Sequence, residues 1–375
     1  MATAARPLKI LHVLRSPLGG LFRHVVDLVN GQIERGHAVG IIADSQSQGA
    51  HSDALLAKLA TLLPLSLGRV PMHRHLSPRD ISAAAHVGRR IRETAADIVH
   101  GHGAKGGAFA RLAARGHPAI RAYTPHGGSL GTVNSAFYNL LEKQLISRTD
   151  LLLFESNHIA ELFRGKLGNW RAITRVVHNG LAPSEFTEST LDPAATDILF
   201  IGELRPIKGI DVLVEAVSDL RRSGLPLTAT IVGAGGSRDV LQAQVLRLGL
   251  NEAITFHPPM PARQAFPLGR LMVVPSRRES LPYIVLEAAA AGVPMLATKV
   301  GGIPEIFGPQ SDLLIPTGDT TSLAQAIGRA INNPETMLGA AASLRERVRA
   351  HFSVDAMVDG VIEGYREALA QRGLV

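Results

Sequence analysis

Short apolar runs alternate with longer amphipathic segments along the whole chain. Residues 8–14, LKILHVL, have the length and character of a buried strand, and the loop SPLGG follows them. Apolar positions then recur at helical spacing over 21–35, and 38–43 is a second strand-like run. A strand, a glycine-containing loop, a helix and another strand, in this order, predict a parallel βαβ unit.

The same alternation continues to about residue 181 and predicts further units of one parallel sheet. The segment 128–150 predicts a loop and a helix whose apolar side chains pack in the core, with docking on an acceptor or a membrane as the alternative. The remaining strands are expected at 62–70, in DIVHGHG (97–103), IRAYTPHGG (120–128), LLLFESNHI (151–159) and RVVHNGL (175–181), with helices near 78–94 and after Ala104.

The second half of the chain repeats the pattern after a break. Residues 182–196, APSEFTESTLDPAAT, have turn composition and no apolar period, so we place the domain boundary there. A length of 375 residues also favours two domains over one core. Strands are expected in DILFIGEL (197–204), TATIVG (228–233) and AITFHPPM (253–260), and helices near 320–331, 334–350 and 354–371. The predicted class is α/β, with two Rossmann-like, doubly wound parallel sheets.

The stretch 273–306, VVPSRRESLPYIVLEAAAAGVPMLATKVGGIPEI, carries the candidate chemistry. It predicts a strand ending at Pro275, a helix from about Pro282 to Ala291, and a further strand after Gly292. Proline suits the first helical turn, where its missing N–H would have no partner. The helix N-terminus favours an anion, because the free amides and the helix dipole both place partial positive charge there.

Two carboxylates frame this helix, Glu279 before it and Glu287 within it. Eight residues at about 1.5 Å rise span roughly 12 Å, near the reach of a nucleotide sugar from hexose to ribose. We therefore expect a diphosphate at the helix N-terminus, a sugar beside Glu279 and a ribose beside Glu287. Glu287 lies in an almost wholly apolar segment, where a carboxylate must find a donor. In the alternative, Glu279 only complements the helix N-terminus and Glu287 is a solvated helix former.

Glu-x7-Glu, followed by AAAAGVPMLAT and VGGIPEI, resembles the donor-site signature of the family 4 retaining glycosyltransferases, which have the GT-B fold. The resemblance covers nearly the whole chain, and it is most specific over 197–306 and weakest over 44–95. It implies an acceptor domain at 1–185, a nucleotide-sugar domain at 186–355, and a terminal helix at 356–375 that packs back towards the first domain.

The resemblance also implies roles for single residues. His126 in TPHG matches the histidine that reaches across the cleft to the transferred sugar, and Lys208 matches a lysine of the motif G-R-L-x-x-x-K-G. Here Glu203 follows Gly202, and Arg205 is a displaced candidate. Arginine and lysine on one strand-to-helix loop suit a diphosphate. The expected catalytic residues are His126, Glu279, Lys208 and Arg205. The expected donor-binding residues are Gly19, Gly20, Gly202, Arg205, Lys208, Gly233, Pro259, Glu279, Ser280, Leu281 and Glu287.

Two competing interpretations fit the residues less well. His100, His102 and His126 fall at predicted strand ends, where ligands bind, but no acidic partner lies at a ligand-like spacing, so we expect no metal. The glycines of 233–236 lack the full G-x-G-x-x-G fingerprint and follow the second strand of their domain, which argues against a dehydrogenase. No cofactor is expected beyond the nucleotide diphosphate sugar as a substrate.

The charge distribution and the composition limit the kinds of partner that we expect this protein to bind. Residues 1–187 hold 22 Lys and Arg against 12 Asp and Glu, a net charge of +10, whereas 188–375 carry −3. This favours an anionic membrane surface or, as the alternative, a merely soluble basic face. Only 4% of residues are aromatic and no nucleic-acid motif occurs, so nucleic acid is not expected. We find no transmembrane run, signal peptide or cysteine, which fits the cytoplasm and the inner face of its membrane.

Together with these patterns, the resemblance implies a retaining, metal-independent hexosyltransferase that uses a nucleotide diphosphate sugar. The expected acceptor is a glycan or a lipid-linked molecule in cell-surface polysaccharide synthesis, of the lipopolysaccharide or exopolysaccharide type. Two alternatives stay open. One is an epimerase or hydrolase of sugar nucleotides on the same fold, and the other is a non-catalytic protein that binds a nucleotide sugar or a nucleic acid.

Overall fold

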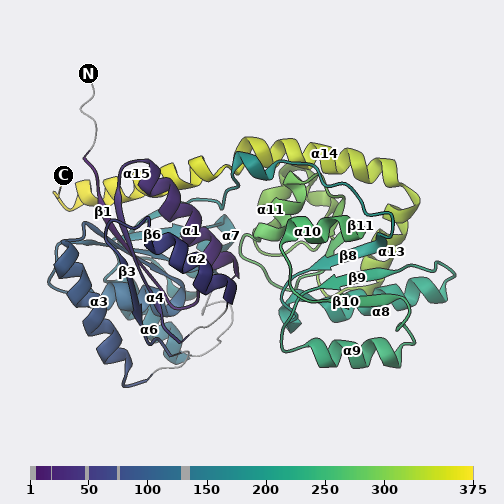
Figure 1. The fold of residues 1–375 in the computed structure, drawn as a ribbon, viewed down its shortest axis with the longest axis horizontal. Helices are drawn as coiled ribbons and strands as arrows, with labels where there is room; N and C mark the ends of the chain where they lie inside the picture. The colour runs from purple at the N-terminus through teal and green to yellow at the C-terminus, as the bar shows by residue number, and fades with distance from the viewer. Residues whose placement is uncertain (1–5, 18, 47–49, 74–76, 128–135, 375) are drawn as a thin grey trace. The chain divides into compact units, whose positions relative to one another are not determined.

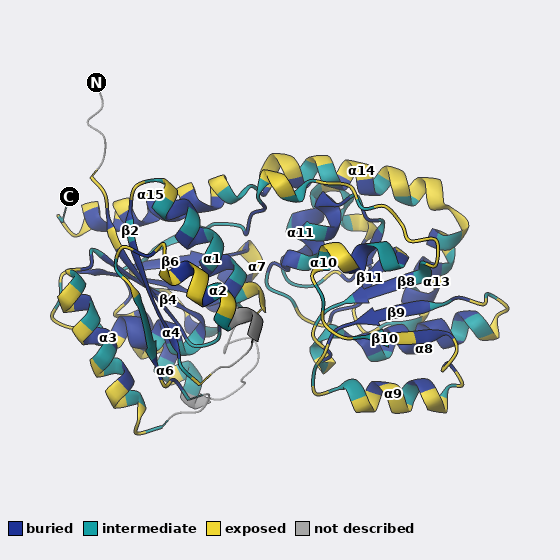
Figure 2. Cartoon of the chain, in the orientation of Figure 1, coloured by how far each residue is buried: buried dark blue, intermediate teal, exposed yellow. Residues whose placement is uncertain are grey.

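The chain forms two compact units, residues 1–179 with 354–375, and residues 180–353. The predicted boundaries at 185 and 355 lie a few residues beyond these. The computed structural model describes residues 6–17, 19–46, 50–73, 77–127 and 136–374 (Figure 1). In each unit, buried strands are covered by helices whose exposed faces are turned outward (Figure 2). Within the described ranges, no helix combines the length and the apolar character that crossing a bilayer would require.

The first unit contains a seven-stranded parallel sheet in the order β3-β2-β1-β4-β5-β6-β7. Its strands are β1 (Lys9–Leu14), β2 (Ala38–Asp44), β3 (Leu67–Val70), β4 (Ile98–His102), β5 (Ile120–Thr124), β6 (Leu151–Phe154) and β7 (Ile173–Val176). Its helices are α1 (Gly19–Glu34), α2 (Ala50–Ala60), α3 (Asp80–Thr94), α4 (Gly103–Ala113), α6 (Ala136–Ile146), α7 (Asn157–Leu167) and α15 (Val354–Gln371).

The two faces of β1 pack against different helices because side chains alternate along a strand. Ile10 belongs to a core cluster with Leu28 of α1 and Val361 of α15. Leu11 belongs to a second cluster with residues of α3 and α4, including Val87. On the face towards α1 and α15, aliphatic side chains give way to histidine at the carboxyl ends of β1 and β4.

The second unit contains a five-stranded parallel sheet in the order β10-β9-β8-β11-β12. Its strands are β8 (Thr196–Ile201), β9 (Ala229–Val232), β10 (Ile254–His257), β11 (Gly269–Val274) and β12 (Met295–Ala297). Its helices are α8 (Ile210–Arg222), α9 (Arg238–Arg247), α10 (Ala262–Ala265), α11 (Tyr283–Ala290), α12 (Ile303–Phe307), α13 (Thr320–Asn332) and α14 (Pro334–His351). Four short 3₁₀ segments complete the described chain, η1 (Pro183–Glu185), η2 (Pro206–Lys208), η3 (Phe266–Leu268) and η4 (Gly308–Leu313).

The prediction of a strand over 62–70 was wrong in its first half. The N–H of Leu62 donates to Leu59 O, and the N–H of Ser66 donates to Leu63 O, so two turns precede a strand that begins at Leu67. The helix α2 was not predicted at all. The predicted loop of 128–135 lies outside the described residues.

The segment predicted as a linker, 182–196, is packed on the second unit. Arg345 of α14 donates to Phe186 O at 2.8 Å and forms an ion pair with Glu188. The N–H of Ser189 donates to Ala291 O at 3.0 Å. These partners lie about a hundred residues or more further along the chain, so no pattern within 182–196 could predict the contacts.

Candidate functional site

Two predicted donor-site residues from distant segments meet in the second unit. Lys208 ends η2, just after β8, and Glu279 follows β11, which is the neighbour of β8 in the sheet. Lys208 Nζ lies 2.7 Å from Glu279 Oε1, and Ser276 Oγ donates to the same oxygen at 2.6 Å. The side chains of Lys208 and Glu279 are 21% and 9% exposed. The pair is therefore a partly solvated charge site at the carboxyl edge of the sheet.

Glycines allow the loops at this edge to touch through their backbones. A Cβ at Gly209 would lie 2.0 Å from Pro275 O, and one at Gly233 would lie 1.9 Å from Gly202 O. Gly209 also has φ of +67° and Gly233 has φ of +154°, which disfavour other residues. Lys208 is thus positioned by a turn that only glycine fits, and the predicted Gly202 and Gly233 serve close packing here.

The start of α11 lies directly after Glu279. Pro282 caps the helix with φ of −74° and ψ of 122°, one position before the first helical turn in which it was predicted. Leu281 is buried in the core. The hydroxyl oxygen of Ser280 is buried and has no hydrogen-bond partner within the described chain. Glu287 is half-buried, within an apolar helix, and makes contacts of its own.

Arg205 does not join the ion pair of Lys208 with Glu279. Its guanidinium is paired with Glu203 at 3.3 Å, and the side chain is 42% exposed. With Arg277 and Arg278 it lines a separate cavity of about 540 Å³. Arg277 is itself held by Asp211, at 2.6 Å. The displaced position of Arg205 in the sequence thus corresponds to a displaced position in the structure.

The other predicted donor-binding residues lie on loops and at a helix start. Pro259 is exposed after β10. Gly19 and Gly20 are the first two residues of α1 in the first unit, and both are exposed. Gly19 has φ of +63° and no atom within 4 Å of where a Cβ would stand. The backbone at this helix start is open to a ligand.

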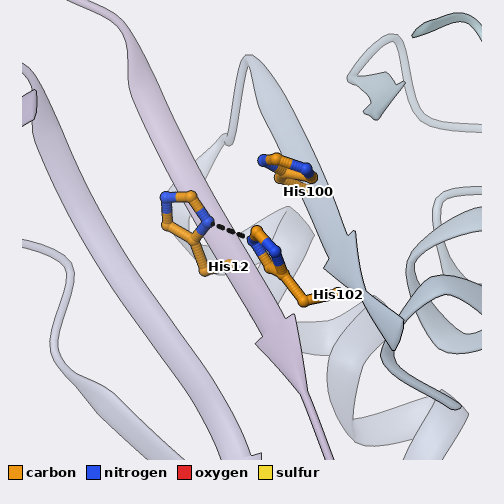
Figure 3. Close-up of side chains that lie close together, drawn as sticks. All are labelled: His12, His100 and His102. Atoms are coloured by element: carbon orange, nitrogen blue, oxygen red, sulfur yellow. Dashed lines mark hydrogen bonds between the residues drawn. The ribbon is translucent and has the colours of Figure 1, made fainter. Parts of the chain in front are cut away.

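Five histidines gather at the carboxyl edge of the first unit's sheet, and we call them the histidine cluster. His12 on β1 lies directly opposite His100 on β4, and His102 is two residues further on. Figure 3 shows these three rings together. His24 comes from α1 and His126 from the loop after β5. All except His126 are at most 2% exposed.

A chain of hydrogen bonds runs through the histidine cluster. His12 Nε2 lies 2.8 Å from Gln32 Oε1, and His12 Nδ1 lies 2.9 Å from His102 Nε2, the dashed line of Figure 3. His102 Nδ1 lies 3.0 Å from His126 Nε2. His126 Nδ1 in turn lies 2.7 Å from Glu155 Oε1. Both ring nitrogens of His126 are therefore engaged within the first unit, and its backbone has φ of +53°.

The other two rings of the cluster differ in their partners. His24 Nδ1 lies 2.9 Å from Asn179 Oδ1, but its Nε2 is buried with no hydrogen-bond partner among the described residues. His100 is satisfied at both nitrogens, by the hydroxyl of Tyr365 at 2.7 Å and that of Thr124 at 2.8 Å. His24 is therefore the ring with an unused lone pair.

Burial keeps four of these rings neutral. Desolvation lowers the pKa of His12 to about 4, and the hydrogen bond from His12 to Gln32 Oε1 only partly offsets this. Desolvation also lowers the pKa values of His24, His100 and His102 well below the ordinary value, and neighbouring histidines lower them further. Neutral imidazole is the form that accepts hydrogen bonds and binds metals.

Two triples within the cluster have ligand atoms within 4.8 Å of one another, which is the arrangement a metal ion requires. One is His12 with His100 and His102, and the other is His24 with His102 and His126. The sequence argument noted three of these histidines but missed His12 and His24. The register of two parallel strands, and a histidine one loop after the first strand, were the signals that could have found them.

Comparisons with known proteins follow the same division of the chain. Residues 18–185 match the family described as Glycosyltransferase Family 4, and residues 195–333 match Glycosyl transferases group 1. A D-inositol 3-phosphate glycosyltransferase from Acidothermus cellulolyticus is 35% identical over 191 residues. That match spans 47% of this chain and 42% of the relative, so the chain covers less than half of that protein's length.

Solved structures match the fold over nearly the whole chain. Sucrose-phosphate synthase from Thermosynechococcus elongatus has a TM-score of 0.80 at 19% identity, covering 98% of this chain and 100% of that one. Anabaena HepE, in complex with UDP and glucose, has a TM-score of 0.79 at 20% identity, covering 96% and 100%. With two parallel-sheet units and both family matches, the chain carries the two domains of a group 1, family 4 glycosyltransferase on a GT-B fold.

Proposed function

We propose that this protein transfers a glycosyl group from a nucleotide diphosphate sugar to an acceptor hydroxyl, with retention of the anomeric configuration and no metal at the diphosphate. The observation that carries the proposal is the pair of Lys208 and Glu279, which brings a cation and a carboxylate together at the carboxyl edge of a parallel sheet. Ligands of such sheets bind at this edge.

The residues around the pair supply the contacts that a sugar nucleotide needs. An ammonium has three donors, so Lys208 can keep its bond to Glu279 and still meet a phosphate oxygen. Ser280 offers a hydroxyl without a partner in the described chain. Glu279 would accept from sugar hydroxyls, Glu287 would bind the ribose, and His126 would serve the transferred sugar from the first unit.

The proposed reaction replaces one bond at the anomeric carbon on a single face. The bond from that carbon to the diphosphate oxygen lengthens, and the acceptor oxygen approaches the same face. The acceptor proton passes to the departing phosphate oxygen, so no covalent enzyme intermediate is needed. Lys208 stabilises the charge that develops on the diphosphate, because it is held in place before the reaction begins.

Two kinds of acceptor have support. The basic first half of the sequence favours a glycan or lipid-linked acceptor at the inner face of the cytoplasmic membrane, in lipopolysaccharide or exopolysaccharide synthesis. The relatives named D-inositol 3-phosphate glycosyltransferase favour a small phosphorylated polyol instead. For the donor, the complex of HepE with UDP and glucose favours a uridine nucleotide.

Nucleotide binding tests the donor site first. UDP, GDP, ADP and their common sugar conjugates are compared by thermal shift and calorimetry, with wild type and Glu287→Ala. A ligand at 100 times its Kd should add about 2.7 kcal/mol of stability. One selective nucleotide whose effect is lost in Glu287→Ala supports the site, whereas binding of none of them overturns it.

Product analysis separates transfer from the alternatives. With donor and an acceptor panel of lipid-linked glycans and phosphorylated polyols, NMR of the new linkage should show the donor's anomeric configuration. Without acceptor, a transferase leaves the donor almost unchanged. Rapid epimerisation or hydrolysis under those conditions would contradict transfer, and tight donor binding without any turnover would identify a binding protein.

A further inference from the structure

We propose that the first unit holds one transition-metal ion of the Zn²⁺ class, bound by His24 Nε2, His102 Nδ1 and His126 Nε2. The site belongs to the first unit and shares His126 with the proposed function: the ion would hold the ring of His126, and only the backbone of this residue would be left to serve the sugar. It departs from our expectation of no metal, because that argument did not include His24, which reaches the strand ends from α1.

The hydrogen bonds of each ring place a lone pair on the nitrogen that would bind the metal. His24 Nδ1 donates to Asn179 Oδ1, so its Nε2 is an acceptor. His126 Nδ1 donates to the carboxylate of Glu155, so in a neutral ring its Nε2 is also an acceptor. Both residues belong to the same compact triple.

The third ligand follows by the same reasoning along the hydrogen-bond chain. His12 Nε2 faces Gln32 Oε1, and in the tautomer that donates to this oxygen His12 Nδ1 accepts from His102 Nε2. This leaves a lone pair on His102 Nδ1, which faces the lone pair of His126 Nε2 across 3.0 Å. In this tautomer the two nitrogens face each other as acceptors, and a cation between them would satisfy both.

A metal ion satisfies this arrangement better than a proton. A proton between His102 and His126 is shared by two nitrogens and leaves His24 Nε2 buried without a partner among the described residues, which is unfavourable. A metal ion engages all three nitrogens. Glu155 is 2% exposed and lies beside His126, so its negative charge partly offsets that of a divalent cation.

The surroundings already have the form of a metal site's outer shell. Histidines that bind metals usually donate their other N–H to a carboxylate, a carbonyl oxygen or another acceptor, which fixes the ring. Here Asn179, Glu155 and His12 fill that role, one for each proposed ligand. The triple of His12, His100 and His102 lacks such an outer shell. Both ring nitrogens of His100 are already hydrogen-bonded to hydroxyl groups, so neither is left to bind a metal.

Three imidazoles select the class of ion. Mg²⁺ and Ca²⁺ prefer oxygen ligands, whereas imidazole suits Zn²⁺, Co²⁺, Ni²⁺ and Cu²⁺. Three protein ligands leave a position for water, and the side chain of His126, 8% exposed, is the most accessible of the three. A bound ion would fix the ring of His126 and leave its backbone, in the left-handed region, for other contacts.

The test uses the full chain without a histidine tag, stripped with a chelator and titrated with Co²⁺ and Zn²⁺. We expect one equivalent of each metal by elemental analysis, with a visible Co²⁺ spectrum of low coordination number. X-ray absorption of the zinc protein should show three nitrogen ligands at about 2.0–2.1 Å. This measurement on wild type stands even if a variant fails to fold.

Two matched variants assign the ligands. His24→Asn keeps a side-chain N–H near the position of Nδ1 but removes Nε2, and His100→Asn removes a buried ring of the other triple. We expect at least tenfold weaker binding in folded His24→Asn and wild-type affinity in His100→Asn. His351→Asn, at an exposed position in the second unit, controls for surface binding.

Each outcome decides the proposal. No stoichiometric metal in folded wild type overturns it, and a proton between His102 and His126 is then the cation. Loss of binding in His100→Asn with retention in His24→Asn overturns the assignment in favour of the other triple. Because the readout is metal content and spectrum, failure of the transferase assay would leave this result unaffected.

Discussion

The proposed donor site of the second unit and the histidine cluster of the first unit both lie at the carboxyl edge of a parallel sheet, but their chemistry is opposite. The donor site pairs formal charges on loops, and Lys208 is 21% exposed there. The cluster holds imidazole rings mostly on strands, and His12 and His100 are fully buried. One edge is built from glycine turns, the other from regular structure and side-chain hydrogen bonds.

This difference separates a site that exchanges ligands from one that keeps its partners. A partly solvated ion pair costs little to rearrange, because water screens both charges. A buried hydrogen-bond network is expensive to open, because each unpaired group loses its solvation. We therefore expect the donor site to respond to substrate and the histidine cluster to respond to pH or a bound cation.

The largest effect should come from the ion pair itself. Lys208→Met and Glu279→Gln keep side-chain size but remove the charges, and loss of a preorganised donor or acceptor typically lowers kcat about 10²–10³-fold. Steady-state kinetics with circular dichroism as a folding check would measure this. Arg222→Ala, which breaks the exposed pair with Asp219, is the control. Near wild-type turnover in both site variants would show that this pair is not the reacting site.

Substitution of Gly209, in the turn that positions Lys208, should give the next largest effect. Gly209 and Gly249 have nearly equal φ, +67° and +69°, but only Gly209 faces a backbone oxygen at 2.0 Å from an added Cβ. Gly249→Ala should cost about 1–2 kcal/mol of unfolding free energy from conformation alone. Gly209→Ala should cost several kcal/mol and weaken nucleotide binding. Equal denaturant midpoints for Gly209→Ala and Gly249→Ala would show that the short distance to the backbone oxygen adds nothing to the loss of stability.

Acid should destabilise the first unit through the histidine cluster. The folded pKa of His12 is about 4, below its unfolded value of 6.5, so the unfolded chain binds more protons between these values. Stability contributed by this ring is complete above pH 6.5 and lost as pH falls towards 4, by up to about 1.4 kcal/mol per pH unit. His24, His100 and His102 add to the same direction.

Thermal unfolding between pH 7.5 and 4.5 measures this dependence. Burial opposes ionisation of Asp97 and Asp150, but Arg6 and Arg121 lower the pKa values of these carboxyl groups, so the stability that they contribute is lost mainly below about pH 4, outside this window. His100→Asn should reduce the slope. A melting temperature independent of pH across this window in wild type would contradict the neutral, buried state of the rings.

The smallest effect should come from Arg205. Its pair with Glu203 is exposed, and such pairs contribute about 0–1 kcal/mol. Arg205→Ala should raise the donor KM no more than about fivefold and leave kcat unchanged. A loss of kcat equal to that of Lys208→Met would instead show that Arg205 moves to the diphosphate when the donor binds.

Particular residues show how much of the candidate site could be predicted from the sequence. Lys208 and Glu279 were both predicted as donor-site residues, from the family resemblance and from their places on loops that follow predicted strands. Their direct contact depends on β11 lying beside β8, although β9 and β10 come between them in the sequence. Arg205 illustrates the limit, since the sequence did not show that it pairs with Glu203 and lines a cavity with Arg277 and Arg278.

The sequence by itself determined the periodicity of strands and helices, the positions of glycines at tight turns, and hence two parallel sheets with reactive residues at their carboxyl edges. These are properties of neighbouring residues. Only the tertiary structure decided that the segment 182–196 packs on the second unit, and that His12, His24 and His126 share one cluster. Strand order and helix packing join residues far apart in the chain, and burial then sets the protonation of the rings they bring together.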